Sequence, residues 1–463
     1  MTRINTEQGQ PQLRREWRLR DLVLFHVTAV VSVRWISLAA ARGPSSLALW
    51  GLSFLVFFLP GAYVVHDLSR RSPEQGGLYR WTKEAFGPFH GFVCAWAYVV
   101  SNLFYFPALL TFAAEMAAAF LFGAQAPASP AFVAAFTLGA IWTITGLNVA
   151  GVRFGRRVQT VGAFSIFLPC ALLVVFGAIL LVRDGSATPL RNLLPGFARL
   201  DTWRTWSSIC FALAGLELAA TMGGEIRDPR RTLPRSVPLA GGAVVSIYLL
   251  GTVGALVLAD SGSLSETRGI LQALDRGFAA LGLLAPVSIL APLLALGGLG
   301  NFGAWLAGSA RMPYAVGVDR FLPPSFARLH PRFETPHVSL LWQAGISSGI
   351  ALLALAGSTV SEAYRVLNDA TTVLYFVPYL YLFAAHFRGT LLAPGRRFAR
   401  RLPASLGFLS TLLAVLLAVL PPPAASNPGG HLAKVLGGSG GFLLLALALY
   451  VRARPRPAPS RNS

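Results

Sequence analysis

The sequence predicts an all-α membrane protein with twelve transmembrane helices. Of its 463 residues, 54% are hydrophobic and only 13% are charged, whereas soluble domains carry roughly 25% charged residues. The apolar residues gather into runs of about 20, the length of an α-helix that crosses a bilayer. Basic residues gather between the runs, in alternately rich and poor segments. Together these observations exclude a soluble protein.

Twelve runs are long and apolar enough to be counted as spans. In chain order they are residues 21–42, 45–67, 89–122, 131–150, 158–182, 203–222, 236–259, 286–310, 337–357, 363–386, 403–421 and 435–451. The third run is the longest, so we expect it to be tilted or to extend beyond the bilayer.

The basic residues predict the orientation of the chain. With the N-terminus in the cytoplasm, 29 of the 39 Lys and Arg residues fall in internal segments, 8 fall outside, and Arg34 and Arg365 fall within spans. An excess of Lys and Arg marks cytoplasmic loops. We therefore expect a multi-pass protein of the cytoplasmic (inner) membrane with both termini in the cytoplasm. The net charge of +20 then reflects topology and attraction to anionic lipid. A nucleic-acid partner is not expected, because no interleaved basic and aromatic surface is present.

Arg34 lies in the middle of the first span. A charge at bilayer depth costs about 3 kcal/mol on insertion scales, so such a residue normally faces a cavity or a partner. The sequence therefore makes Arg34 a candidate functional residue. The alternative is that Arg34 snorkels to the interface or neutralises a structural carboxylate.

The sixth span carries a second irregularity, with Gly215 followed by Glu217. Spans one and six are five apart, as an inverted five-plus-five repeat requires, and transporters often place their sites where such paired helices are interrupted. A break in mid-membrane exposes N–H groups at a positive dipole end, which can bind a carboxylate, and carbonyls, which can bind an ammonium group. The alternative is that Gly215 only permits close helix packing. The candidate substrate-binding residues at the two breaks are Ser32, Val33, Arg34, Trp35, Phe211, Ala212, Ala214, Gly215 and Glu217. We expect Arg34 to contact the substrate, or to pair with Glu217 when the site is empty.

Spans three and eight add further candidates. Asn102 and Tyr105 lie about one helical turn apart and share a face, and Tyr105 could either cover a substrate or pack between helices. Asn301 and Trp305 are four residues apart in a glycine-rich stretch. A carboxamide at this depth needs a partner, so we include both as binding candidates.

Three other residues are candidates for gating or ion coupling: His26, Arg365 and Asp369. Since Arg365 and Asp369 lie near the external end of span ten, an external gate or a structural ion pair is expected there. Neither a metal nor another cofactor is expected, because the three cysteines lack metal-ligand spacing. No Ser/His/Asp arrangement or phosphate-binding loop is found either, so we do not expect an enzyme.

The spans and breaks predict an organisation in six parts. These are a cytoplasmic tail (1–20), a first repeat of five spans (21–182), an external loop (183–202), a second repeat of five spans (203–386), two further spans (387–451) and a disordered cytoplasmic tail (452–463). We expect a short interfacial helix between spans five and six, and an amphipathic external helix over residues 264–284.

Three stretches resemble the amino acid–polyamine–organocation (APC) superfamily. Residues 68–88 carry a proline, a paired glycine and an aromatic before Glu-Ala-Phe-Gly. Residues 211–235 resemble the superfamily's motif in span six and its basic exit loop. Residues 309–336 are similar to the segment after span eight. The resemblance implies a LeuT-type inverted repeat with spans eleven and twelve peripheral, and alternating access of amino acids or related amines.

The chain departs from this superfamily at two places. Most members have a Gly-small-Gly run where this chain has Ser32-Val33-Arg34, a form closer to the glutamate/γ-aminobutyrate antiporter branch. The lysine that some proton-coupled members carry in span five is missing, with Ile166 near its place. We therefore expect a permease or antiporter for a small amino acid or related carboxylate, with the coupling ion and the oligomeric state left open. The alternative is a non-transporting amino-acid sensor on a transporter fold.

Overall fold

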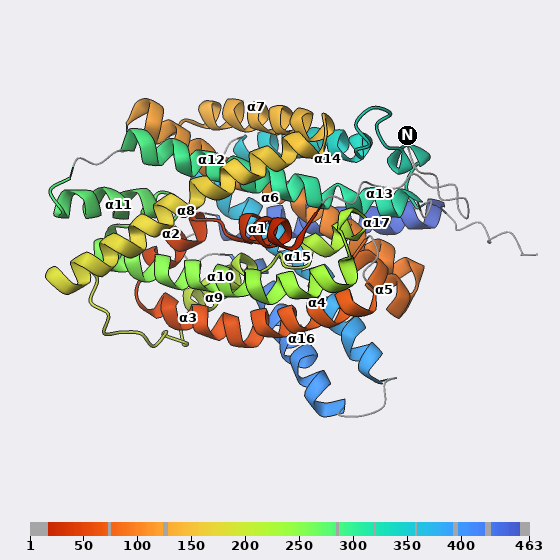
Figure 1. Cartoon of the computed structure of the whole chain (residues 1–463), viewed down its shortest axis with the longest axis horizontal. Coiled ribbons are helices and arrows are strands. Elements are labelled where there is room, and N and C mark those ends of the chain that lie inside the picture. Colours follow the sequence, from red (N-terminus) through yellow and green to blue (C-terminus); the bar gives the residue numbers. More distant parts are fainter. Residues whose placement is uncertain are drawn as a thin grey trace, which may run out of the picture.

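The computed structural model describes residues 17–72, 76–123, 128–283, 287–318, 321–356, 359–391, 397–421 and 427–453. The predicted N-terminal and C-terminal tails therefore lie almost entirely outside the described residues. Within the described ranges every regular element is a helix, and one isolated bridge joins Trp17 to Ile226. Most of the long helices run along the longest axis of the molecule (Figure 1).

The elements occur in the following order. They are α1 (Leu19–Val30), α2 (Arg34–Ala41), α3 (Ser45–Ser53), the π-helix η1 (Phe54–Phe58), α4 (Leu59–Arg71), α5 (Leu78–Phe86), α6 (Pro88–Phe122), α7 (Pro130–Val149), α8 (Val152–Arg183), α9 (Leu200–Ala212), η2 (Leu218–Glu225), α10 (Pro229–Leu258), η3 (Ser261–Ser263), α11 (Gly269–Ala280), α12 (Val287–Ser309), α13 (Arg311–Val318), η4 (Pro324–Ala327), α14 (His337–Leu355), α15 (Val360–Leu391), α16 (Arg397–Val419) and α17 (Pro428–Ala453).

The described residues contain ten stretches long and apolar enough to cross a membrane, and the bent pair α1 and α2 makes an eleventh. The all-α membrane fold is thus confirmed, as is the unusual length of the third span, which is the 35-residue α6. The sixth predicted span is interrupted. It consists of the 13-residue α9 and the eight-residue 3-10 helix η2, so neither half is long enough to be counted alone.

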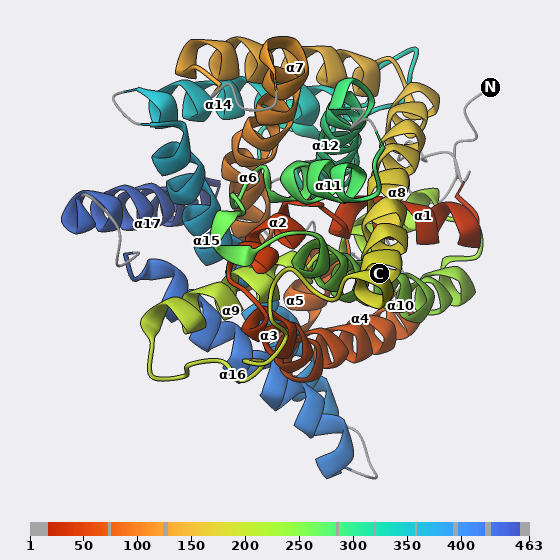
Figure 2. The same ribbon diagram turned by 90° about the vertical axis from the view of Figure 1, so that its left-hand side faces the viewer.

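The last two spans lie at the edge of the bundle. In Figure 2, α17 lies at the left edge of the molecule and α16 extends toward its lower edge. In α6, 89% of the most apolar 18-residue stretch is buried, compared with 17% in α17. α6 is therefore a central helix, whereas most of the surface of α17 is not covered by the rest of the protein.

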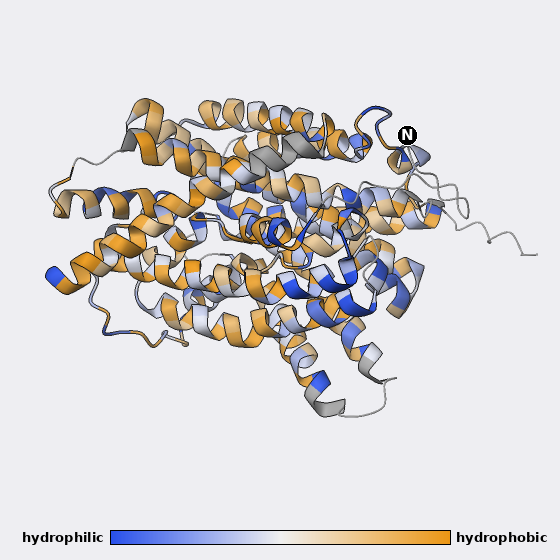
Figure 3. Cartoon of the chain, viewed as in Figure 1, coloured by the Kyte–Doolittle hydropathy of each residue, from blue (hydrophilic) through white to orange (hydrophobic). Residues whose placement is uncertain are grey.

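Charged segments gather at one end of the molecule. Figure 3 shows hydrophilic residues around α5 and the start of α10, while most of the remaining ribbon is hydrophobic. At the opposite end, α11 confirms the amphipathic helix expected over residues 264–284. The short helix expected between spans five and six was wrong: residues 184–199 form turns and irregular backbone. Pro189, Pro195 and Gly196 in this loop favour turns over a helix.

Glycines bring α8 and α12 close enough together to fix the helix that carries Asn301. A Cβ added at Gly162 would lie 2.4 Å from the Cα atom of Gly300, a distance that no side chain tolerates. The two backbones therefore pack directly against each other, as small residues permit in membranes. This packing sets α12 beside α1, where its Asn301 and Trp305 reach the break in span one.

Candidate functional site

The first span is broken where the sequence predicted. α1 ends at Val30, α2 begins at Arg34, and the two axes differ by 44°. A helix end leaves its last carbonyl groups and first N–H groups without partners inside the helix. In a buried break these groups need other partners or a ligand.

Side chains from two other helices take up the freed carbonyl groups. The Asn301 amide donates to the carbonyls of Thr28 (2.5 Å) and Ala29 (2.9 Å), and the Trp305 indole donates to Ala29 (2.6 Å). The Tyr248 hydroxyl donates to Val30 at 2.7 Å. Asn301 therefore acts on the broken backbone, and its remaining oxygen accepts from Tyr105 at 3.2 Å.

The N–H groups of the same break, unlike its carbonyl groups, have few hydrogen-bond partners. The Ser32 N–H donates to the hydroxyl of Tyr248 at 3.1 Å. Among the described residues, no hydrogen bond is made by the N–H of Val33 or of Arg34. The break in span one therefore presents free donors and hardly any free acceptors.

The sixth span is broken around Gly215, as predicted. α9 ends at Ala212, and Gly215 has φ +122°, which a residue with a side chain rarely adopts. Its N–H donates to the Tyr379 hydroxyl (2.9 Å) and to Glu217 (3.2 Å). The glycine is needed for this turn in addition to any role in packing.

Glu217 lies fully buried in a cage of tyrosines. Tyr98 donates to its carboxyl group at 3.3 Å, Tyr379 donates at 2.5 Å, and Tyr375 also donates to it. With the Gly215 N–H, four donors converge on the two oxygens. Buried polar groups are stable only when their hydrogen bonds are made, and this cage makes them.

Arg34 does not pair with Glu217, so that part of our hypothesis was wrong. The Arg34 guanidinium is also fully buried, but it donates to Asn368 (2.9 Å) and Tyr364 (3.3 Å) on α15. Four donors already occupy the Glu217 carboxyl group, which leaves no room for a guanidinium.

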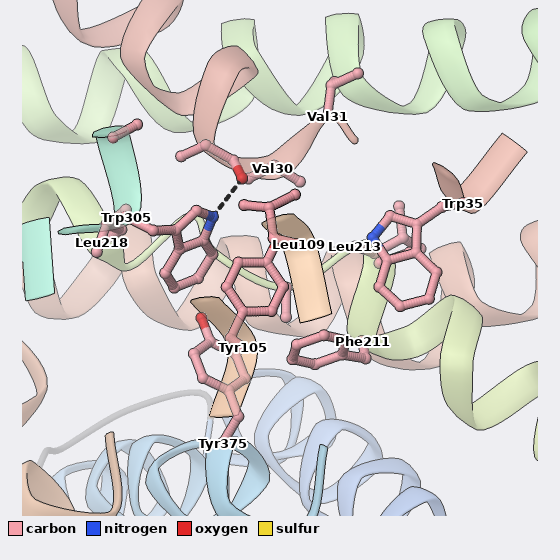
Figure 4. Close-up of a cluster of buried hydrophobic side chains, with 14 of the residues drawn as sticks. Val30, Val31, Trp35, Tyr105, Leu109, Phe211, Leu213, Leu218, Trp305 and Tyr375 are labelled. Carbon is pink, nitrogen blue, oxygen red and sulfur yellow. Dashed lines mark hydrogen bonds between the residues drawn. The ribbon is translucent and has the colours of Figure 1, made fainter. Parts of the chain in front are cut away.

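A narrow cavity lies between the two breaks. Its volume is about 10 Å³, room for roughly one water molecule. Five aromatic rings point toward one another around it (Figure 4): Trp35, Tyr105, Phe211, Trp305 and Tyr375. The rest of its lining is Ala29, Val30, Ala212 and Ala214.

Six of the thirteen predicted binding residues border this cavity, including Ala212 and Ala214, and Asn102 does not. Trp35, Tyr105, Phe211 and Trp305 border the cavity. Asn102 turns back to the carbonyl of Tyr98 in its own helix, at 2.7 Å.

The three gating or coupling candidates lie elsewhere. His26 is buried and contacts Ser236 at 3.1 Å. Asp369 contacts Arg204 at 2.9 Å and His431 at 3.0 Å. Arg365 lies 4.0 Å from Glu266 in a more exposed position.

Sequence reasoning missed the tyrosines that complete the site. They come from spans three, seven and ten: Tyr98, Tyr248, Tyr364, Tyr375 and Tyr379. The available signal was a buried hydroxyl in an apolar span, which needs a hydrogen-bond partner. For Tyr375 and Tyr379, the spacing of four also places both hydroxyls on one helix face.

Comparison with known proteins agrees with this geometry. Residues 19–439 match the family described as amino acid permease. The chain is 27% identical to an uncharacterised transporter of Legionella pneumophila over 415 residues, which cover 87% of this chain and 89% of that protein. It is 23% identical to a glutamate/γ-aminobutyrate antiporter of Lactococcus lactis (83% and 80% covered) and 24% identical to a serine/threonine exchanger of Bacillus subtilis (79% and 80% covered).

The broken spans, the buried site between them and the match over most of the chain point the same way. These similar proteins are transporters, not enzymes. The chain belongs to the amino acid permease family of the APC superfamily.

Proposed function

We propose that this protein is a secondary active transporter that moves a small amino acid or related carboxylate across the membrane by alternating access. One observation carries the proposal. At the break in span one, side chains occupy the carbonyl groups, while the N–H groups of Val33 and Arg34 have no partner in the part of the chain that the structure describes. Free N–H groups at a helix N-terminus, in the positive field of the dipole, form an anion site. A substrate carboxylate suits it.

The break in span six supplies the complementary end. α9 ends at Ala212, and the C-terminal end of a helix favours a cation. Ala212 and Ala214 border the same cavity as Trp35, which follows the donors of span one. A molecule with a carboxylate at one end and an ammonium group at the other fits between two such breaks.

Alternating access is supported by the size of the cavity. A space of about 10 Å³ is far smaller than any amino acid. Binding therefore requires the halves of the broken helices to move, and each break is a point at which its helix can bend. Discontinuous helices at the midplane serve this purpose in many transporters.

The similar proteins limit how far the substrate can be narrowed. One is an exchanger of serine and threonine, and another exchanges glutamate and γ-aminobutyrate. These substrates are amino acids, but another similar protein, from Lactococcus lactis, is a probable agmatine/putrescine antiporter. The relatives therefore support an amino acid or a related amine, and the choice between the two needs an argument from this chain's own site.

Purified protein in liposomes tests the proposal. Vesicles loaded with unlabelled amino acids are mixed with labelled ones, and accumulation is followed with and without gradients of protons or sodium. We expect saturable flux of at least one amino acid. Binding without flux in either direction would instead identify an amino-acid sensor on a transporter fold.

A further inference from the structure

The Arg34 guanidinium is held by one of its edges only. Nη1 donates to Asn368 and Tyr364 of α15. The guanidinium carbon lies 4.1 Å from the ring centre of Trp35 and 5.1 Å from that of Tyr105. These contacts fix both the plane and the position of the guanidinium.

The other edge of the guanidinium is without partners. Nε and Nη2 of Arg34 are both buried, and among the described residues neither has a hydrogen-bond partner. These two nitrogens form the planar fork with which arginine binds a carboxylate through two parallel hydrogen bonds.

Among the described residues, no carboxylate forms an ion pair with Arg34. Four acidic side chains on or beside the elements around the site each have their own partners. Glu217 has its tyrosine cage and Asp369 has Arg204 and His431. Glu266 pairs with Arg42, and Glu115 pairs with Arg268. A buried charge without a partner is strongly unfavourable. An anion from outside the chain that bound the fork would remove this cost.

This fork is separate from the backbone donors of the break. The side chain of Arg34 extends away from its own N–H toward α15, where Asn368 and Tyr364 hold it. Trp35 and Tyr105, which face the guanidinium, also line the cavity. The fork therefore lies beside the cavity, at a different place from the free N–H groups of Val33 and Arg34.

We infer that the Nε–Nη2 edge of Arg34 binds a second carboxylate, so the substrate is an acidic amino acid. This inference rests on the proposed function, in which the backbone donors bind the first carboxylate. Glutamate and aspartate carry the second one, whereas glutamine and asparagine have nearly the same shape without the charge. Glutamine and asparagine should bind more weakly, because they leave the buried fork without a carboxylate.

Binding of these four amino acids to the purified protein tests the inference. We expect glutamate or aspartate to bind at least about 30-fold more tightly than its amide, the effect of removing one partner of a buried charge pair. Arg34→Gln should abolish the preference and change amide binding less than about threefold. Arg34→Lys keeps the charge but loses the fork, and should retain part of the preference. Arg191→Gln, in the exposed loop before α9, is the control and should behave like the wild type.

Several outcomes would overturn the inference. Equal binding of acid and amide by the wild type would do so, as would an equal loss for both in Arg34→Gln, which would assign Arg34 to the first carboxylate. If chloride stabilises the protein and acidic amino acids do not compete with it, the fork of Arg34 binds an inorganic anion and not the substrate. If Arg34→Gln does not fold, the wild-type ratio and Arg34→Lys decide. If neutral amino acids are transported with no acidic preference, only this inference fails, whereas the absence of any amino-acid flux defeats the proposed function as well.

Discussion

The Tyr248 hydroxyl lies 3.1 Å from the backbone nitrogen of Ser32 and accepts its hydrogen bond. The same hydroxyl lies 2.7 Å from the carbonyl oxygen of Val30 and 3.2 Å from that of Ala212. One side chain of α10 thus joins the breaks of spans one and six. Its ring is held by stacking on Trp50, with centroids 4.6 Å apart.

The first prediction concerns this hydroxyl. In Tyr248→Phe the ring still stacks on Trp50, but the N–H of Ser32 and the carbonyl of Val30 lose their partner. An unsatisfied buried polar group costs about 1–3 kcal/mol, so we expect a lower apparent melting temperature. We also expect the apparent KM to rise by more than the maximal rate falls, because the breaks that form the site are no longer held together.

Tyr63→Phe is the control for this prediction. Tyr63 is 39% exposed and contacts His386 only through its ring. Substrate affinity and melting temperature should both stay at wild-type values. If Tyr248→Phe behaves in the same way, the hydroxyl has no role in holding the breaks.

The second prediction concerns the backbone at Gly215. Alanine at φ +122° is strained, at a cost on the order of 1–3 kcal/mol. Its Cβ would also lie 3.1 Å from Val30 Cγ2 and 3.2 Å from Trp305 Cζ2, so it would push against two residues that line the cavity. We therefore expect Gly215→Ala to lower both the stability and the affinity for substrate, measured by thermal shift with and without amino acid.

Gly139→Ala is a matched control in the helix α7. A Cβ at Gly139 meets no atom within 4 Å, and alanine is favoured over glycine in a helix by roughly 0.5–1 kcal/mol. This variant should be as stable as the wild type or more so. An unchanged Gly215→Ala protein would show that the turn in span six tolerates a side chain.

The helical fold and the location of the breaks were predictable because they depend on local sequence. Apolar length defines a span, and a charge such as Arg34 or a glycine such as Gly215 marks where a span is irregular. Burial and φ at these two residues agree with that interpretation.

The partners of the site residues were not predictable, because they depend on how distant helices rotate against one another. Arg34 and Glu217 have opposite charges and lie on paired helices, so their pairing was a reasonable hypothesis. The structure instead satisfies Glu217 with tyrosines of α6 and α15. No local pattern shows that a tyrosine 158 residues away faces a given carboxyl group.

The third prediction concerns the tyrosine cage. In Glu217→Gln one carboxyl oxygen becomes an NH₂ group, which faces donors from Tyr98 and Tyr375 on one side or from Tyr379 and Gly215 on the other. At least one of these donors loses its acceptor, at a cost of about 1–3 kcal/mol. We expect a lower melting temperature and at least tenfold slower exchange in liposomes.

Glu84→Gln provides the comparison for the cage. The Glu84 side chain is 51% exposed and bonded to Arg80 on α5, and an exposed ion pair contributes little, about 0.3–0.5 kcal/mol for this helical spacing. Exchange should continue at the wild-type rate. If the two substitutions change the exchange rate and the melting temperature equally, the tyrosine cage around Glu217 contributes to neither.

The fourth prediction concerns the contact between α9 and α15. Arg204 and Asp369 lie 2.9 Å apart with side chains only 13% and 15% exposed, so solvent screens the pair weakly. In a double-mutant cycle of Arg204→Gln and Asp369→Asn, unfolding in mixed micelles should give a coupling energy above roughly 1 kcal/mol. The same cycle on the exposed pair Arg80 and Glu84 should give about 0.3–0.5 kcal/mol. A coupling at Arg204 and Asp369 no larger than this would show that the pair does not hold α9, the first half of span six, against α15.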